Sequence, residues 1–330
     1  MRARTAVVLA ACAALGLVAG CSSSEPADDA RLSIVASTNV WGDVARQVAG
    51  DLADVSSIVD DPSVDPHSFE ASARVELAIS RADLVVVNGG GYDDFASQLV
   101  DALDAPPPVV DAVDASGLAD EDATDEHAAD EHAADEHAAD EHAEDEHADD
   151  EHGHAHGELN EHVWYDLATV QAVARDIADA LAEIAPEHAA TFARNADDFS
   201  GEVDGLTHSA AQIAQAYGGT GVVVTEPVPV YLVQTAGLED RTPPEFAESV
   251  EQEIDVPPAA MDETLALVAS HDVALLVYNE QTTGPQTDQV VQAARDAGLP
   301  VVNVTETLPE GEDYVSWMAG NLEALAQALA

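Results

Sequence analysis

Short runs of β-branched residues recur along the chain in two groups, one ending near residue 111 and the other beginning near residue 222. Within the first group, stretches with helical spacing of apolar residues separate the runs, such as Trp41 to Val48 and Arg74 to Ala82. Such alternation is typical of βα units that build a parallel sheet. The sequence therefore predicts an α/β fold with two lobes. The predicted strands are Ile34–Ala36, Val55–Val59, Leu84–Val87, Val109–Val110, Val222–Val224, Ala274–Val277 and Val301–Val304.

Two helical stretches lie between the groups. Apolar residues from Val170 to Ile184 are spaced three or four apart, and a longer stripe from Phe192 to Tyr217 keeps the same spacing. The longer stripe predicts a single helix that would join the lobes as a stiff strut. Gly201 and Gly205 lie inside it and cost about 1 kcal/mol each relative to Ala, so a kink or break there is the alternative.

The N-terminal segment has the features of a secretory signal. A basic start is followed by an apolar run, Thr5 to Leu17, that is too short for a membrane span. The run ends in Leu17–Cys21, which resembles a lipobox, where the signal is cleaved before the cysteine and the thiol is acylated. An ordinary signal peptide is the alternative. We expect residues 1–20 to be the signal, residues 21–31 a tether, and Cys21 a lipid anchor on the outer face of the cell membrane.

The cysteine count restricts the chemistry further. The chain has two cysteines. If Cys12 is removed with the signal and Cys21 is lipidated, the mature protein has no disulfide and no thiolate metal site. Any bound metal ion would be held by histidines and carboxylates.

The charge balance is strongly acidic, with 65 Asp and Glu against 10 Lys and Arg and a formal net charge of −55. Nucleic acids and anionic membrane surfaces require clustered cations, so this balance argues against both as partners. Cationic ligands remain compatible with it.

Residues 120–156 differ from the rest of the chain because the triplet Asp-Glu-His recurs six times at a period of five. The segment has no apolar residue larger than Ala and cannot bury a core, so we expect a disordered surface loop. Imidazoles and carboxylates bind borderline divalent metals, which favours a metal-collecting loop over a solvated acidic spacer. Collection should weaken below about pH 6.5, where imidazole is protonated. The histidines of this loop are His127, His132, His137, His142, His147, His152, His154 and His156.

Two histidines outside the loop are candidate ligands. His67 follows the second predicted strand, and His162 precedes the first interlobe helix. The other three, His188, His208 and His271, are interpreted as incidental surface residues. In open α/β sheets, ligands collect at the carboxyl ends of strands. That rule selects Glu226 and Glu306, with Glu280 as a competitor.

The motifs around these residues resemble the cluster A-I solute-binding lipoproteins, which serve ABC transporters for zinc and manganese. The resemblance covers roughly Leu32 to Ala330. It is carried by Asp65–Glu70, Ala82–Gly89, His162–Asp166 and Tyr314–Leu322, with the His-rich loop placed just before the third of these motifs.

The resemblance implies two similar α/β lobes joined by one long helix, with a metal ion bound in the cleft between them. The matching ligand positions here are His67, His162, Glu226 and Glu306. The third position is a His in zinc members and a Glu in several manganese members, and the fourth is usually an Asp. The Pro that usually follows the third motif is Leu167 here. We expect lobes at residues 32–165 and 218–330, with a helical region at 166–217.

The chain is therefore interpreted as a non-enzymatic, monomeric lipoprotein that captures a divalent metal ion outside the membrane and delivers it to an ABC permease. Two imidazoles and two carboxylates favour Mn²⁺ or Fe²⁺, whereas the His-rich loop favours Zn²⁺. Because Zn²⁺ outcompetes Mn²⁺ at almost any N/O site, zinc is the preferred interpretation.

Two other classes remain as alternatives. A metallohydrolase would keep a position open for water, which a fourth protein ligand would close, and no H-E-x-x-H, Walker A or G-x-S-x-G motif is present. In a metal buffer or adhesin, the His-rich loop would be the working part and the cleft would be secondary.

Overall fold

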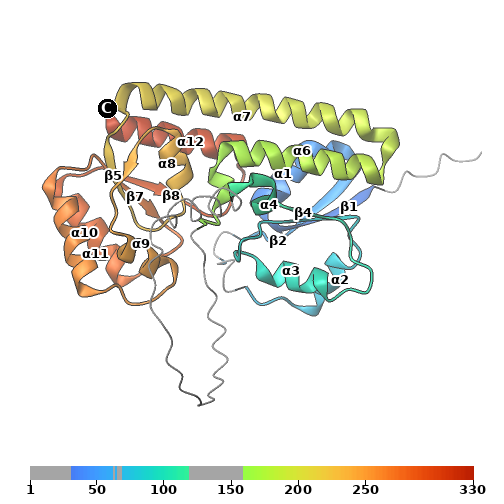
Figure 1. Ribbon diagram of the computed structural model, residues 1–330, viewed down its shortest axis with the longest axis horizontal. Helices are drawn as coiled ribbons and strands as arrows, with labels where there is room; N and C mark the ends of the chain where they lie inside the picture. Colours follow the sequence, from blue (N-terminus) through green and yellow to red (C-terminus); the bar gives the residue numbers. More distant parts are fainter. Residues whose placement is uncertain (1–30, 62–63, 65–68, 119–158) are drawn as a thin grey trace, which may run out of the picture. The chain divides into compact units, whose positions relative to one another are not determined.

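Two four-stranded parallel sheets organise the fold, which confirms the predicted α/β class (Figure 1). The structure is a computed structural model that describes residues 31–61, 64, 69–118 and 159–330. The first sheet has the order β2-β1-β3-β4 and the second β6-β5-β7-β8. The strands are β1 (Leu32–Thr38), β2 (Ala53–Val59), β3 (Leu84–Val87), β4 (Val109–Asp111), β5 (Gly221–Val224), β6 (Glu239–Asp240), β7 (Leu276–Asn279) and β8 (Val301–Val304).

The first sheet is covered on both faces, which explains why its strands are almost continuously apolar. Alternate residues of β1 point to opposite sides: Ile34 packs in the core with the helices α1 and α6, whereas Val35 packs with α2 and α3. The helices of this lobe are α1 (Asn39–Ala49), α2 (Ala73–Ile79), α3 (Asp94–Asp101) and α4 (Ala112–Ser116). Figure 1 shows α2 and α3 on the side of the sheet away from α6.

The second sheet is built in the same way. Val222 of β5 packs in the core with α8 and α12, whereas Val223 packs with α9, α10 and α11. The helices of this lobe are α8 (Val230–Thr235), α9 (Pro244–Glu251), α10 (Pro258–Ser270), α11 (Pro285–Ala297) and α12 (Tyr314–Leu329).

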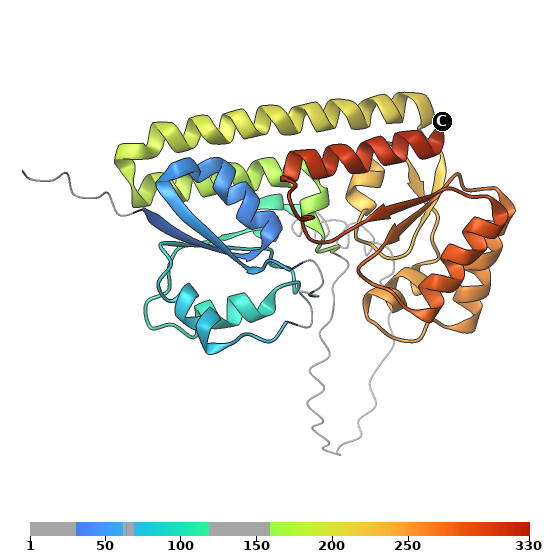
Figure 2. The ribbon, with the colours of Figure 1, turned by 180° about the vertical axis from the view of Figure 1, so that it is seen from behind.

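A long helix connects the lobes, as the apolar stripe predicts. After α6 (Leu167–Ile184) and a 3-10 turn at Pro186–His188, α7 runs from Ala189 to Tyr217 over 29 residues. It continues through Gly201 and Gly205, both exposed, so the predicted alternative of a break is wrong. Figure 2 shows α7 alongside α6 in one part of its length and α12 in the other.

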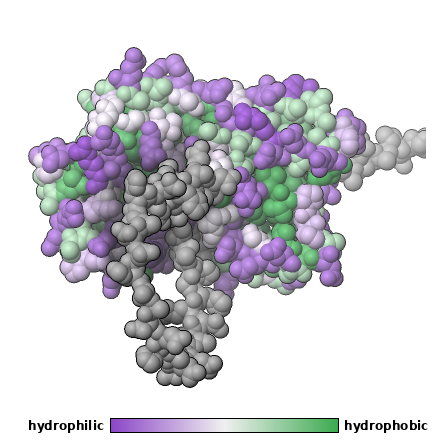
Figure 3. Space-filling model, viewed as in Figure 1, coloured by the Kyte–Doolittle hydropathy of each residue, from purple (hydrophilic) through white to green (hydrophobic). Residues whose placement is uncertain are grey.

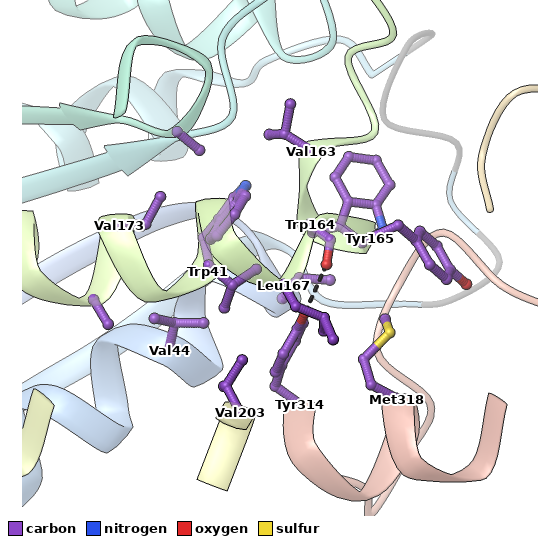
Figure 4. Packing of buried hydrophobic residues seen from close by; sticks show 14 of the residues in the cluster. Trp41, Val44, Val163, Trp164, Tyr165, Leu167, Val173, Val203, Tyr314 and Met318 are labelled. Atoms are coloured by element: carbon purple, nitrogen blue, oxygen red, sulfur yellow. Dashed lines mark hydrogen bonds between the residues drawn. The ribbon is translucent and has the colours of Figure 1, made fainter. Parts of the chain in front are cut away.

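The start of α12 joins the two lobes (Figure 4). The buried Tyr314 Oη donates a hydrogen bond to the carbonyl of Trp164 at 2.8 Å, and its backbone N–H donates to the Asp43 carboxylate at 2.9 Å. Around this contact, apolar residues from α1, α6, α7 and α12 form a single cluster. A shared core therefore extends from the first sheet to the second.

Most strand bounds differ from the sequence prediction by one or two residues, and one strand was not predicted. β7 begins at Leu276, two residues later than predicted, because the paired register with β5 starts there. Ala274 and Leu275 already bond to β5 through the Ala274 N–H and the Leu275 carbonyl. β6 was not predicted, since its two residues are acidic and exposed and only backbone pairing with β5 defines it.

The described part of the chain contains no helix that combines the length and the apolarity needed to cross a bilayer. The face drawn in Figure 3 carries mainly hydrophilic side chains, with smaller apolar patches between them. This surface agrees with the acidic composition.

We predict that Gly205→Ala will stabilise the protein by about 1 kcal/mol, because Ala has the higher helix propensity and a Cβ at this position meets nothing within 4 Å. Thermal or urea unfolding measures the change. The matched control is Gly298→Ala, where space is equally open but φ is +73°, and destabilisation of about 1 kcal/mol is expected. Loss of stability in Gly205→Ala would contradict a continuous α7.

Candidate metal centre

His162 is fully buried and lies just before the 3-10 turn η2 (Val163–Tyr165). Its ring Nδ1 lies 2.7 Å from Oδ1 of Asn160, which also accepts a hydrogen bond from the His162 backbone N–H at 3.1 Å. Because Oδ1 can only accept, Nδ1 is the donor in this contact, and in the neutral imidazole Nε2 then carries the lone pair. A fixed neutral imidazole of this kind is suited to bind a metal ion through Nε2.

Asn160 also connects His162 to the second lobe. Its Nδ2 donates to the carbonyl of Pro227 at 2.9 Å, and its own carbonyl accepts a hydrogen bond from Tyr231 Oη at 2.8 Å. Pro227 directly follows the candidate ligand Glu226. One asparagine therefore orients the imidazole of one lobe against the segment that carries a carboxylate of the other.

Aromatic rings enclose the imidazole. Tyr92 and Trp164 lie edge-on to His162, with ring centroids 5.8 and 5.1 Å away. Both aromatic side chains are buried. A shell of this kind excludes water and lowers the local dielectric, which strengthens the interaction of the site with a charge.

A glycine turn after β3 places Tyr92. Gly89, Gly90 and Gly91 all have positive φ, and a Cβ on Gly89 would collide with the Asp111 carboxylate. The buried Asp93 closes the turn by accepting hydrogen bonds from the backbone N–H groups of residues 88 and 89 at 2.6 and 2.9 Å. The turn thus has a fixed conformation that directs Tyr92 toward His162.

Glu306 follows β8 and is 6% exposed. Its Oε1 accepts hydrogen bonds from Asn279 Nδ2 at 2.6 Å and Thr282 Oγ1 at 3.4 Å, and its Oε2 accepts one from Tyr92 Oη at 3.2 Å. Its backbone N–H donates to Gln281 Oε1 at 2.6 Å. The carboxylate is therefore oriented by groups from both lobes.

The loop that carries Glu306 is also anchored to the first lobe. Asn39, at the start of α1, exchanges two hydrogen bonds with the backbone of Leu308: Nδ2 donates to its carbonyl at 2.8 Å, and Oδ1 accepts from its N–H at 3.0 Å. Tyr165 Oη donates to the carbonyl of Thr305 at 2.7 Å. Residues on either side of Glu306 are thus held in place.

Glu226 follows β5 and is 2% exposed. Burial raises the pKa of the Tyr165 hydroxyl, and the carboxylates of Glu306 and Glu226 raise it further. Both carboxylates therefore lie within electrostatic range of the turn that begins at His162. Three of the four sequence-predicted ligands are thus buried, and their segments are linked through Tyr92 and Asn160. Among the described residues, the group of close potential ligand atoms that contains His162 does not include Glu226 or Glu306.

The other predicted residues lie at least partly exposed at the surface or fall outside the described residues. Glu280 is exposed and accepts a hydrogen bond from Asn303 Nδ2 at 3.1 Å, so it turns toward the surface, away from the buried pair. His208 and His271 are exposed, and His188 lies partly exposed beside Phe192. His67, the loop histidines and Cys21 lie outside the described residues.

Glu251, the last residue of α9, was not predicted. Its Oε1 lies 3.3 Å from His162 Nε2, and its side chain is 16% exposed. Within the part of the chain that the structure describes, Glu161, His162 and Glu251 form a group whose potential ligand atoms lie within 4.8 Å of one another. No sequence signal distinguishes Glu251, because Glu245 and Glu248 share its spacing on the same acidic helix.

The family model described as zinc-uptake complex component A, periplasmic, matches residues 34–328. The chain belongs to this family. The resemblance drawn from the sequence motifs is thereby confirmed, and membership agrees with the expectation that the protein is not an enzyme.

The curated relatives are named for metal binding. The zinc-binding lipoprotein AdcA of Streptococcus pneumoniae serotype 4 is 26% identical over 331 residues, covering 98% of this chain, which spans 60% of that relative's length. A putative metal-binding protein of Treponema pallidum is 24% identical over 332 residues, covering 98% of this chain and 96% of its own. Other relatives are named for iron or manganese.

Solved structures show the same fold. The periplasmic zinc-binding protein TroA of Treponema pallidum aligns with a TM-score of 0.68 at 15% identity, covering 91% of this chain and 99% of its own.

We predict that Tyr92→Phe will weaken binding of the first equivalent of Zn²⁺ about tenfold, the usual effect of removing a group that orients a ligand. The lost hydroxyl is the donor to Glu306 Oε2. Competition with a chromophoric chelator measures the affinity. Tyr217→Phe, at the end of α7, is the control and should leave it unchanged. Equal affinities in all three proteins would contradict a role for Tyr92.

Proposed function

We propose that the protein is an extracytoplasmic solute-binding lipoprotein that captures a divalent metal ion between its lobes and delivers it to an ABC permease for import. The observations that support this most directly are the burial of one imidazole, His162, and of two carboxylates, Glu226 and Glu306, and the contacts that link their segments. Tyr92 lies beside His162 and donates to Glu306, and Asn160 joins His162 to Pro227, next to Glu226. Burying carboxylates is costly unless hydrogen bonds or positive charge compensate. A divalent cation would supply that charge.

The proposed ligand set is His67, His162, Glu226 and Glu306. His67 is included on its sequence motif, since it lies outside the described residues. Four protein ligands would close the coordination sphere of the ion. A closed sphere suits carriage of the ion and not activation of a water molecule.

Zn²⁺ is the proposed cargo, with Mn²⁺ or Fe²⁺ as the alternative. Two carboxylates make the set harder than one rich in imidazole, but Zn²⁺ still binds such sites more tightly than Mn²⁺ does. The names of the matched relatives include all three metals, so the choice rests on this affinity order and on the His-rich loop. Tight retention of Mn²⁺ against equimolar Zn²⁺ would overturn the choice of zinc.

The His-rich loop, residues 120–156, is proposed as a low-affinity collector that raises the local metal concentration near the cleft. The same loop supports a second candidate function, an extracellular metal buffer in which the cleft is secondary. The two functions differ in which part of the chain carries the tightest site.

Deletion of residues 120–156 separates them, and we predict that one tight Zn²⁺ site will survive it. In the shortened chain, His67→Ala or His162→Ala should weaken binding by at least about tenfold, because each removes a proposed ligand. His188→Ala is the matched control and should have no effect. Isothermal titration calorimetry gives the stoichiometry and affinity. Disappearance of the tight site on deletion alone would favour the buffer.

We also propose that residues 1–20 are a signal peptide, that residues 21–31 are a tether, and that lipid on Cys21 anchors the mature monomer. Cys21→Ala is predicted to move the protein from the membrane fraction to the soluble fraction or the medium, because it removes the acylated thiol. Fractionation and immunoblotting measure the distribution, and Ser22→Ala serves as the control. Membrane association that persists without Cys21 would contradict lipidation.

A further inference from the structure

We propose that Glu251 is an additional ligand of the metal ion, supplied by α9. This inference rests on the proposed function and extends its ligand set. Glu251 belongs to the second lobe and meets His162 of the first, with Oε1 and Nε2 separated by 3.3 Å.

The separation suits two atoms bound to one metal ion. Zinc ligands lie about 2.0–2.2 Å from the ion, so two of them at a tetrahedral angle are about 3.4 Å apart. The distance between Glu251 Oε1 and His162 Nε2 is close to this value. A cation could therefore enter between these atoms with little displacement of either side chain.

The orientation of the His162 ring also supports Glu251 as a ligand. Asn160 accepts the Nδ1 proton of His162, which directs the Nε2 lone pair to the side where Glu251 lies. Nε2 is the atom that the proposed function requires for binding. Glu251 thus approaches the ligand atom itself, instead of the opposite edge of the ring.

The backbone fixes the position of Glu251. The N–H of Ile254 donates to the carbonyl of Ser249 at 2.9 Å, and that of Glu253 donates to the carbonyl of Val250 at 3.0 Å. This is a Schellman motif, and it places Glu253 at φ +53°, a conformation that costs about 1–2 kcal/mol for a residue other than glycine. The end of α9 is therefore tightly closed directly after Glu251.

The electrostatic setting of Glu251 favours a cation. Its side chain is mostly buried, and it lies at the C-terminal end of a helix, where the partial negative charge of the helix dipole disfavours a carboxylate. The neighbouring Glu161 adds a further carboxylate within the same group. A divalent ion at His162 would be attracted by all of these charges.

A fifth ligand of this kind changes the chemistry of the site. It would add a carboxylate oxygen to two imidazoles and two carboxylates and so increase the preference for harder ions. The coordination sphere of zinc can expand from four ligands to five. Glu251 would in addition connect α9 to the metal ion, so that metal binding would restrain the position of this helix as well as that of the strand ends.

The test compares Glu251→Gln with Glu248→Gln in the full chain. Glu248 is an exposed glutamate one turn earlier on α9, so both changes remove one negative charge from the same helix. Competition with a chromophoric chelator measures binding of the first equivalent of Zn²⁺. We expect Glu251→Gln to weaken it about tenfold or more, as removal of a group at a metal site does, and Glu248→Gln to leave it within about twofold.

Co²⁺ provides a second readout that does not depend on stability. Its visible absorption depends on coordination number, so the spectrum of the one-to-one complex should change in Glu251→Gln and stay unchanged in Glu248→Gln. Unchanged Zn²⁺ affinity and an unchanged Co²⁺ spectrum in Glu251→Gln would overturn the proposal and leave Glu251 as a neighbour of His162 with no part in metal binding.

His162→Ala, measured in parallel, distinguishes a failure of this proposal from a failure of the proposed metal-binding function. Loss of tight binding in His162→Ala together with full binding in Glu251→Gln would overturn the role of Glu251 alone. Full binding in His162→Ala would overturn the proposed site itself.

Discussion

The shared apolar core is the constraint on which the rest of the structure depends. Buried residues of α1, α6, α7 and α12 form one cluster that extends from the first sheet to the second. Separating the lobes widely would expose this surface to water, at roughly 25 cal/mol for each Å². The buried Tyr314, hydrogen-bonded to Trp164 and Asp43, belongs to this cluster. A wide hinge motion between the lobes would therefore carry a large cost in free energy.

The sequence predicted the architecture well because both sheets are covered on two faces. Strands such as Leu84–Val87 are continuously apolar, and the long stripe of α7 is unambiguous in its spacing. β6 escaped detection because only its backbone pairing, with no apolar pattern, defines it. The residue bounds of the signal, tether and lobes are untested by the structure and remain predictions.

The candidate site was predicted partly from topology and partly from sequence motifs. Glu226 and Glu306 follow strands, and parallel strands bring their carboxyl ends together, but Glu280 follows a strand as well. The family resemblance was needed to prefer the first two and to select His162. Tyr92 and Glu251 contact the same site through the packing of a glycine turn and of a helix end. Their sequence neighbours look equally suitable, and only the tertiary fold distinguishes them.

The paired hydrogen bonds between Asn39 and Leu308 have a consequence for selectivity. They hold the loop of Glu306 against the other lobe, while Asn160 holds His162 against the segment of Glu226. Much of the conformational entropy of these proposed ligands is thus lost when the chain folds, and little would remain to be lost on binding an ion. Discrimination among ions then depends on how closely each one's preferred bond lengths and angles match a nearly rigid set of oxygen and nitrogen positions.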